Sequence, residues 1–122
     1  MGTFSTAARV ADIADRDREI SVPQMLVDTG SEYTWVTASL LEQIGVEREK
    51  KDRHFVMANG EEITRPVGFA VLHVAGTFTV DEVVFAEPAD FLLLGARTLE
   101  GLNLVVDAAQ KKLVAAGPLP VA

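Results

Sequence analysis

One carboxylate in the sequence stands where it could do chemistry. Asp28 follows the apolar run Met25-Leu26-Val27 and begins the triplet Asp28-Thr29-Gly30. A core residue or a neutral turn would be the ordinary continuation of a buried strand, because a buried charge is costly unless it is paired. One interpretation is an Asx turn, in which the Asp side chain only stabilises a bend. The other is catalytic, since a carboxylate on a tight loop can act as a general acid or base.

Acid/base cleavage of an amide without a metal ion ordinarily needs two carboxylates. One is ionised and takes a proton from water, while the other is protonated and polarises the carbonyl. Two carboxylates held about 3 Å apart cannot both ionise, so their pKa values separate and they share one proton. Such chemistry requires a site that delivers two carboxylates from equivalent positions.

Composition bounds the class of protein. The 122 residues are 48% hydrophobic and 24% charged, which predicts one globular domain. The net charge of −7 argues against a nucleic-acid partner, because phosphate binding needs clustered Lys and Arg. The absence of Cys excludes disulfides, thiolate nucleophiles and Cys-bound zinc. With no signal-peptide pattern and no apolar stretch approaching eighteen residues, we expect a soluble, cytoplasmic protein with no membrane partner.

The elements expected around the triplet are mostly strands. Residues 4–11 and 19–28 predict a hairpin joined by the acid-rich segment 12–18. That segment lacks the sixth-position glycine and the twelfth-position Glu of an EF-hand, so a solvated loop is favoured over a calcium site. Residues 37–45 predict a short helix with a Thr or Ser cap at its start and Gly45 at its end.

The second half of the chain predicts further hairpins. Asn59-Gly60 between two short runs is the strongest local hairpin signal in the sequence. The expected elements are strands at 54–58 and 61–65, strands at 67–74 and 77–85, a strand at 92–95, a helix at 96–100, and strands at 104–107 and 113–114. We therefore expect an all-β single domain over residues 1–122 with two short helices.

Three segments occur together in a characteristic order. They are residues 26–31 with the triplet, the hairpin tip 58–60, and Leu93-Leu94-Gly95 before a helix. The triplet by itself is expected by chance in roughly a few per cent of chains of this length. In order and spacing, over residues 20–114, the sequence resembles the retropepsin-like (retroviral-type) aspartic protease family, and its prokaryotic single-domain members in particular. The resemblance implies a closed, barrel-like β fold with a flap hairpin and one or two short helices.

The resemblance also implies roles for the matched residues. Asp28, Thr29 and Gly30 would form the catalytic loop. In it, Gly30 would supply backbone freedom and the Thr29 hydroxyl would hydrogen-bond to the partner loop. Leu94 and Gly95 would cross beneath this loop and support it.

Substrate contacts follow from the same resemblance. Ser31, beside the catalytic Asp, and the hairpin tip Ala58, Asn59 and Gly60 would bind the peptide. The tip would be the flap that closes over the substrate and excludes water.

The number of triplets implies the oligomeric state. Asp-Thr-Gly occurs once and Asp-Ser-Gly nowhere, so the second catalytic carboxylate would come from Asp28 of a homodimer partner. The implied activity is an aspartic endopeptidase that cleaves peptide or protein substrates with no cofactor and no metal ion. Ala96 stands where retroviral members commonly carry the Arg that braces the dimer, and Arg97 follows it.

Two other functional classes stay open. One is a catalytically silent retropepsin-like dimerisation or peptide-binding module, since a fold can outlive its chemistry. The other, ranked last, is a β-rich small-ligand binder in which the triplet is coincidence.

Four further side chains have plainer interpretations. Trp35 fits either the core or a pocket wall. His54 and His73 have no Cys or triad partner near them in sequence and are expected as a surface and a strand residue. Asp107 is expected in a turn rather than as a further catalytic acid.

Overall fold

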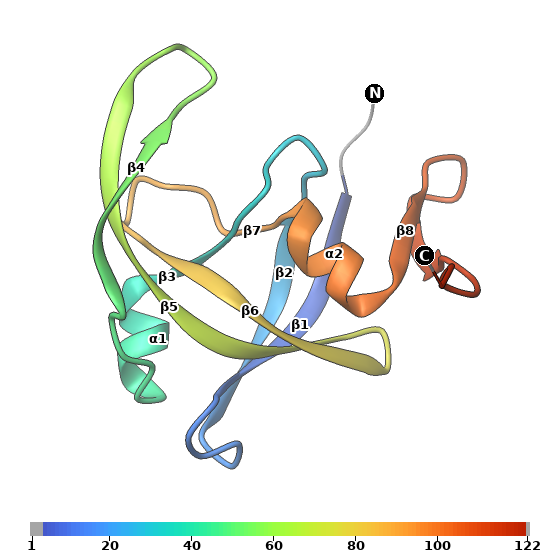
Figure 1. The fold of residues 1–122 in the computed structure, drawn as a ribbon, viewed down its shortest axis with the longest axis horizontal. Helices are drawn as coiled ribbons and strands as arrows, with labels where there is room; N and C mark the ends of the chain where they lie inside the picture. The colour runs from blue at the N-terminus through green and yellow to red at the C-terminus, as the bar shows by residue number, and fades with distance from the viewer. Residues whose placement is uncertain (1–3, 122) are drawn as a thin grey trace.

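The computed structural model describes residues 4–121, which form nine strands and two short helices (Figure 1). Residues 1–3 and 122 of the expected domain lie outside the described residues. In chain order the elements are β1 Phe4–Asp12, β2 Glu19–Val27, β3 Thr34–Thr37, α1 Ala38–Gln43, β4 Lys50–Val56, β5 Glu62–Val74, β6 Thr77–Ala86, β7 Leu93–Leu94, α2 Ala96–Leu102, β8 Leu104–Asp107 and β9 Lys112–Ala115.

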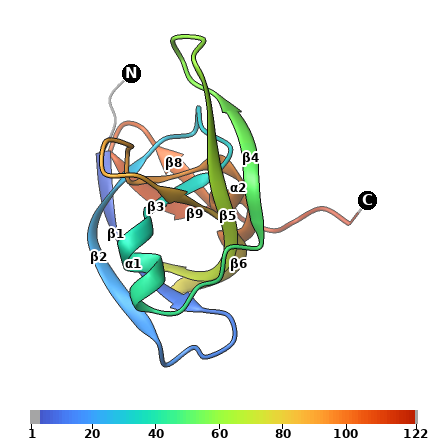
Figure 2. The ribbon, with the colours of Figure 1, turned by 90° about the vertical axis from the view of Figure 1, so that its left-hand side faces the viewer.

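Seven strands form one sheet that closes on itself. Their order is β1-β2-β7-β3-β6-β5-β4, and β1 pairs in addition with β5. The additional pairing closes a ring of six strands. The seventh strand, β4, pairs with the first half of β5, and these two strands project from the ring as a hairpin (Figures 1 and 2). The prediction of an all-β, closed and barrel-like fold with short helices is confirmed.

The core fills the inside of this ring. The largest fully buried side chains come from strands on all sides of it and from α1: Phe85, Met25, Leu41, Leu72 and Leu94. Met25 and Leu94 come from the pair of strands next to Asp28. Packing of the core therefore fixes the position of the strand end that carries the carboxylate.

Strand β5 differs from the sequence prediction. Residues 61–65 and 67–74 were expected as separate strands, but β5 runs without a break from Glu62 to Val74. Pro66 lacks an N–H, and the β4–β5 register shifts opposite it, between Lys50 and Arg53. Because of this irregularity, no carbonyl of β4 has to pair with the N–H that Pro66 lacks. One strand therefore joins the barrel to the hairpin above it (Figure 2).

The β5–β6 hairpin and helix α1 follow the sequence in most respects. Ala75 and Gly76 have φ values of 51° and 81°, the positive angles that a two-residue hairpin loop requires. Gly45, with φ 84°, follows the end of α1 as expected. Thr37 stands at the N-cap of α1 but its side chain makes no capping hydrogen bond, so the expected cap is wrong in that detail.

Two acidic residues outside the cleft have structural roles. Asp12, expected in a solvated loop, is 3% exposed, and its Oδ2 accepts a hydrogen bond of 2.7 Å from Arg18 Nη2. This ion pair accounts for the burial of the Asp12 carboxylate. Asp107 Oδ1 accepts a hydrogen bond of 3.1 Å from Gln110 N in the β8–β9 turn, as expected for a turn residue.

Among residues 4–121 no helix is long and apolar enough to cross a membrane.

Candidate active site

Asp28 follows the last residue of β2 and lies on a tight loop. Its Oδ1 accepts a hydrogen bond of 2.9 Å from Gly30 N, and its carbonyl accepts one of 3.2 Å from Ser31 N. The Asx turn considered from the sequence is therefore present. Within the described chain, no hydrogen bond engages the second carboxylate oxygen, Oδ2. The turn orients the carboxylate and leaves one oxygen available.

Gly30 serves the loop for a different reason than expected. Its φ does not lie in the left-handed region, so backbone freedom is not what the position requires. A Cβ built on Gly30 would instead lie 3.1 Å from Asp28 Oδ1. A side chain here would crowd the carboxylate that the Gly30 N–H holds.

The segment Leu93–Gly95 lies against the Asp28 loop. β7 pairs in parallel with the end of β2, and Asp28 N donates a hydrogen bond of 3.0 Å to the Leu94 carbonyl. A Cβ on Gly95 would meet the carbonyl oxygen of Tyr33 at 2.3 Å, so only glycine fits between these backbones. Ala96 N donates to the Ser31 carbonyl at 2.7 Å, which joins α2 to the same loop.

The β4–β5 hairpin ends in the expected tip. Met57 N donates to the Glu61 carbonyl at 2.7 Å, and Gly60 N donates to the Met57 carbonyl at 2.9 Å. Gly60 has φ 84°, and Asn59 Oδ1 accepts a hydrogen bond of 2.9 Å from Glu61 N. Ala58, Asn59 and Gly60 are exposed at the end of this projecting hairpin (Figure 1).

A cleft of about 440 Å³ lies between the Asp28 loop and this hairpin. Its lining residues are Asp28, Gly30, Ser31, Glu32, Tyr33, Trp35, His54, Phe55, Val56, Met57, Ala58, Asp90, Phe91 and Leu93. Of the site residues expected from the sequence, the cleft brings together Asp28, Gly30, Ser31 and Ala58. Thr29, Asn59, Gly60, Leu94 and Gly95 do not line it.

Aromatic side chains form one wall of the cleft. The ring centroids of Trp35 and Phe55 lie 5.1 Å apart, and those of Tyr33 and Phe55 lie 5.4 Å apart in an edge-to-face arrangement. Trp35 is 7% exposed, so it belongs to both the core and the cleft. His54 is exposed, as expected, and also lines the cleft. Among the described residues, no group of three or more His, Cys, Asp or Glu side chains could hold a metal ion.

Several lining residues were missed by the sequence analysis. Phe55 lies on β4 and Met57 directly follows it, within the apolar run 55–58 that leads into the hairpin tip. The position of this run beside the expected flap is the signal that could have identified both residues. Phe91 is 66% exposed and comes from the loop before β7, where nothing in the sequence pattern separates it from a loose surface residue.

An ion pair connects this loop to the base of the hairpin. Arg65 Nε and Nη2 donate to the two carboxylate oxygens of Asp90 at 2.7 and 3.0 Å. Asp90 Oδ2 also accepts a hydrogen bond of 2.8 Å from Glu87 N. The Arg65 hydrogen bond is the largest influence on Asp90 and holds the pKa of that carboxyl below its usual value. The loop that carries Phe91 is thereby fixed to β5.

Arg97 has partners within the chain. Its guanidinium lies 4.9 Å from the centroid of the Tyr33 ring, and Nη2 lies 3.7 Å from Asp81 Oδ1 and 3.9 Å from Glu82 Oε1. The side chain is 41% exposed. Arg97 thus supports the cleft wall through Tyr33.

Comparisons with known proteins agree with this geometry. The family described as "gag-polyprotein putative aspartyl protease" matches residues 20–101. A similar solved structure is the solution structure of simian foamy virus (mac) protease, at 21% identity and a TM-score of 0.51, covering 79% of this chain and 91% of that chain. No curated protein sequence matches the chain. The chain therefore belongs to the retropepsin-like aspartic protease family.

Proposed function

We propose that this protein is an aspartic endopeptidase in which Asp28 of two identical chains activates one water molecule. The observation that carries the proposal is the environment of Asp28. Its carboxylate lines the cleft, is oriented by the Gly30 N–H, and keeps Oδ2 free of hydrogen bonds within the described chain. Membership of an aspartic protease family supports the same assignment.

The proposed reaction needs the two Asp28 carboxyls to share one proton. The ionised carboxylate takes a proton from the water, whose oxygen attacks the scissile carbonyl carbon. The protonated carboxyl donates its proton to the carbonyl oxygen, which gives a gem-diol. The Asp28 carboxyl that took the water proton then gives it to the amide nitrogen while the other, now ionised, takes a proton from a gem-diol hydroxyl, so that the carbon–nitrogen bond breaks, an acid and an amine are released, and the pair again shares one proton.

The dimer is proposed because one chain carries one such triplet. Thr29 is exposed, and within residues 4–121 its hydroxyl makes no hydrogen bond, so it is available to bond across a two-fold axis to the partner loop. The exposed tip Ala58-Asn59-Gly60 would act as the flap, and an extended peptide would lie between it and Ser31. Leu94 and Gly95 would support the catalytic loop from below.

The remaining parts of the proposal concern the chain as a whole. Residues 1–122 would act as one protease domain, without cofactor or metal ion, and in the cytoplasm. The similarity to prokaryotic single-domain members in particular stays a prediction.

The test compares wild type with Asp28→Asn. Molar mass in solution is measured first, and then cleavage of a peptide library from about pH 4 to about pH 7.5, with and without a statine-type transition-state mimic. We expect a dimeric mass, and cleavage that Asp28→Asn abolishes and the mimic blocks. Asp17→Asn, which removes an exposed carboxylate in the 12–18 loop, is the matched control and should cleave as wild type does.

Three outcomes contradict the proposal in different ways. Equal cleavage by wild type and Asp28→Asn would show that the carboxylate is not catalytic. A strict monomer at high protein concentration would remove the second carboxylate. A dimer that binds peptides and cleaves none would favour the silent binding module.

A further inference from the structure

Two threonines are buried near the cleft with their hydroxyl groups in contact. Thr34 on β3 and Thr98 on α2 are both 0% exposed. Their Oγ1 atoms lie 2.6 Å apart, although 64 positions separate them in sequence. Thr34 Oγ1 also accepts a hydrogen bond of 3.0 Å from Gly95 N, and Thr98 Oγ1 lies 2.9 Å from Asp81 Oδ2.

The partners fix the direction of every hydrogen bond in this chain. Thr98 Oγ1 donates its single hydroxyl proton to Asp81 Oδ2. The Thr98 oxygen must then accept from the Thr34 hydroxyl. The Thr34 oxygen, having used its own proton, accepts from Gly95 N–H. A series of three hydrogen bonds, all pointing the same way, therefore runs from Gly95 N–H through Thr34 and Thr98 to the Asp81 carboxylate on β6. We call it the threonine network.

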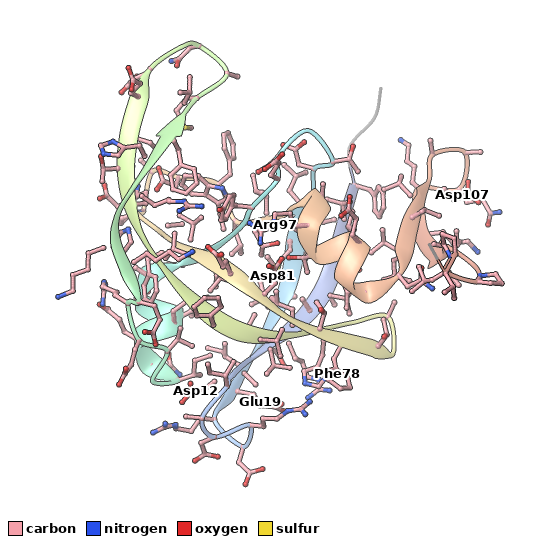
Figure 3. The ribbon with its side chains drawn as sticks, viewed as in Figure 1. Asp12, Glu19, Phe78, Asp81, Arg97 and Asp107 are labelled. Carbon is pink, nitrogen blue, oxygen red and sulfur yellow. The ribbon has the colours of Figure 1, made fainter. Side chains whose placement is uncertain are left out.

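Asp81, at one end of the threonine network, is held firmly by its neighbours. Its side chain is 12% exposed, and its Oδ1 accepts a hydrogen bond of 2.7 Å from Glu82 N. The Arg97 guanidinium lies 3.7 Å from the same oxygen, and Figure 3 shows the two residues next to each other beside α2. This cation offsets part of the cost of burying the carboxylate.

The other end of the threonine network is Gly95 N–H, and the peptide group of this N–H is hydrogen-bonded to Asp28. Gly95 N–H and the Leu94 carbonyl belong to the same peptide group, which is planar. The Leu94 carbonyl accepts the hydrogen bond from Asp28 N at 3.0 Å. Because the peptide plane is rigid, the hydrogen bond to Thr34 that orients the N–H also orients the carbonyl that holds Asp28.

We propose that Asp81 and Thr98 are positioning residues for Asp28, acting through Thr34 and the Leu94–Gly95 peptide group. The inference rests on the proposed function for its catalytic consequence. Asp81 orients the two hydroxyl protons, the hydroxyls orient the peptide plane, and the plane holds the backbone of the catalytic loop. The energy of a buried polar network is shared among its members, so loss of any one link affects the far end.

The test uses Thr98→Val, which keeps the shape and removes the hydroxyl, and Thr98→Ser, which restores it. We expect kcat to fall about 10- to 100-fold in Thr98→Val with KM within about 3-fold of wild type, because a small displacement of a reacting group is costly. Thr98→Ser should recover kcat to within about 3-fold. Asp81→Leu should resemble Thr98→Val, and the double variant should lose little more than either single one.

Thr37→Val is the matched control. Thr37 ends the same strand as Thr34, and its side chain makes no capping hydrogen bond, so this variant should keep wild-type kcat. Urea unfolding of each variant confirms that the assays are made on folded protein. Backbone amide hydrogen exchange at Asp28 and Gly95 gives a readout independent of activity, and both amides should exchange faster in Thr98→Val than in wild type or Thr37→Val.

The outcomes separate this inference from the proposed function. Unchanged kcat and unchanged exchange at Asp28 in folded Thr98→Val would overturn the inference while Asp28→Asn could still abolish cleavage. Failure of Thr98→Ser to recover kcat would show that the position needs its methyl group rather than its hydroxyl, which also overturns it. If wild type cleaves nothing, the proposed function fails. The amide exchange rates then decide by themselves whether the threonine network holds the Asp28 backbone.

Discussion

Substitution of Gly95 by alanine tests how the segment beneath Asp28 supports the loop. A Cβ at this position would lie 2.3 Å from the Tyr33 carbonyl oxygen and 2.7 Å from that of Glu32. Both contacts are with backbone, which cannot rotate away as a side chain can. Relief to an ordinary van der Waals distance requires the two segments to separate by about 1 Å.

The expected cost follows from what this separation breaks. Ala96 N and Arg97 N donate to the Ser31 and Glu32 carbonyls at 2.7 and 3.1 Å, and neither hydrogen bond survives a separation of that size. At about 1 kcal/mol for each bond, and with the strain of overpacking, we expect the free energy of unfolding to fall by about 2–4 kcal/mol. Cleavage by the remaining folded protein should also fall, because the same bonds hold the Asp28 loop.

Urea unfolding measures this cost, with the fluorescence of Trp35 as the signal. Trp35 is the single tryptophan and is 7% exposed at the cleft wall. All variants must be compared at one protein concentration, because dissociation of the proposed dimer would contribute to the measured stability. Gly76→Ala is the matched control. It places a Cβ in open space at φ 81°, so it should cost only about 1–2 kcal/mol of backbone strain and leave kcat unchanged. A Gly95→Ala variant as stable as wild type would refute the reasoning.

Three further results are expected. Because Arg65 lowers the pKa of Asp90, the stabilisation from this carboxylate is present above its unfolded pKa and is lost as the pH falls through the folded value. The stability difference between wild type and Asp90→Asn, measured by urea unfolding, should therefore be present at neutral pH and shrink in acid, and a difference independent of pH would contradict it. Burial, with help from Arg9 and Arg16, lowers the pKa of His73, so stability should fall as the pH drops below about 6.5, and His73→Gln should flatten that part of the unfolding profile. Leu94→Ala should lower the free energy of unfolding by about 2–5 kcal/mol, since its side chain is fully buried, and a cost under about 1 kcal/mol would mean that the site collapses around the missing atoms.

Local signals located most of the elements correctly. Positive φ angles at Gly45 and Gly76 stand where the sequence places turns, because few residues other than glycine adopt them readily. Strands were recognised by their apolar runs, and the β4–β5 hairpin by Asn59-Gly60. There were three exceptions. The strand β3 at Thr34–Thr37 was not expected, and β4 begins at Lys50, in a charged stretch before the expected start at residue 54. The third is Pro66, since a proline ordinarily ends a strand, but the register of β4 shifts opposite it and β5 continues through it.

The site was predictable only as far as its short motif extends. Asp28 and Ala58 were expected in one place through a family resemblance, and both line the cleft. The aromatic wall and the Arg65–Asp90 ion pair were not expected, because each joins residues from segments that are far apart in sequence. A single sequence contains no signal for which side chains of two distant strands face each other.

The sequence by itself determined the residue that could do the chemistry, the turns, and the apolar pattern that forms a closed β fold. Those features depend on backbone preferences and on burial, which act over a few neighbouring residues. Only the tertiary structure decided that Gly95 must be glycine because the Tyr33 backbone touches it, and that Thr34 and Thr98 contact each other in the core. Closure of the barrel brings these distant segments together, and the hydrogen bonds between buried polar groups then follow because none of them can be satisfied by water.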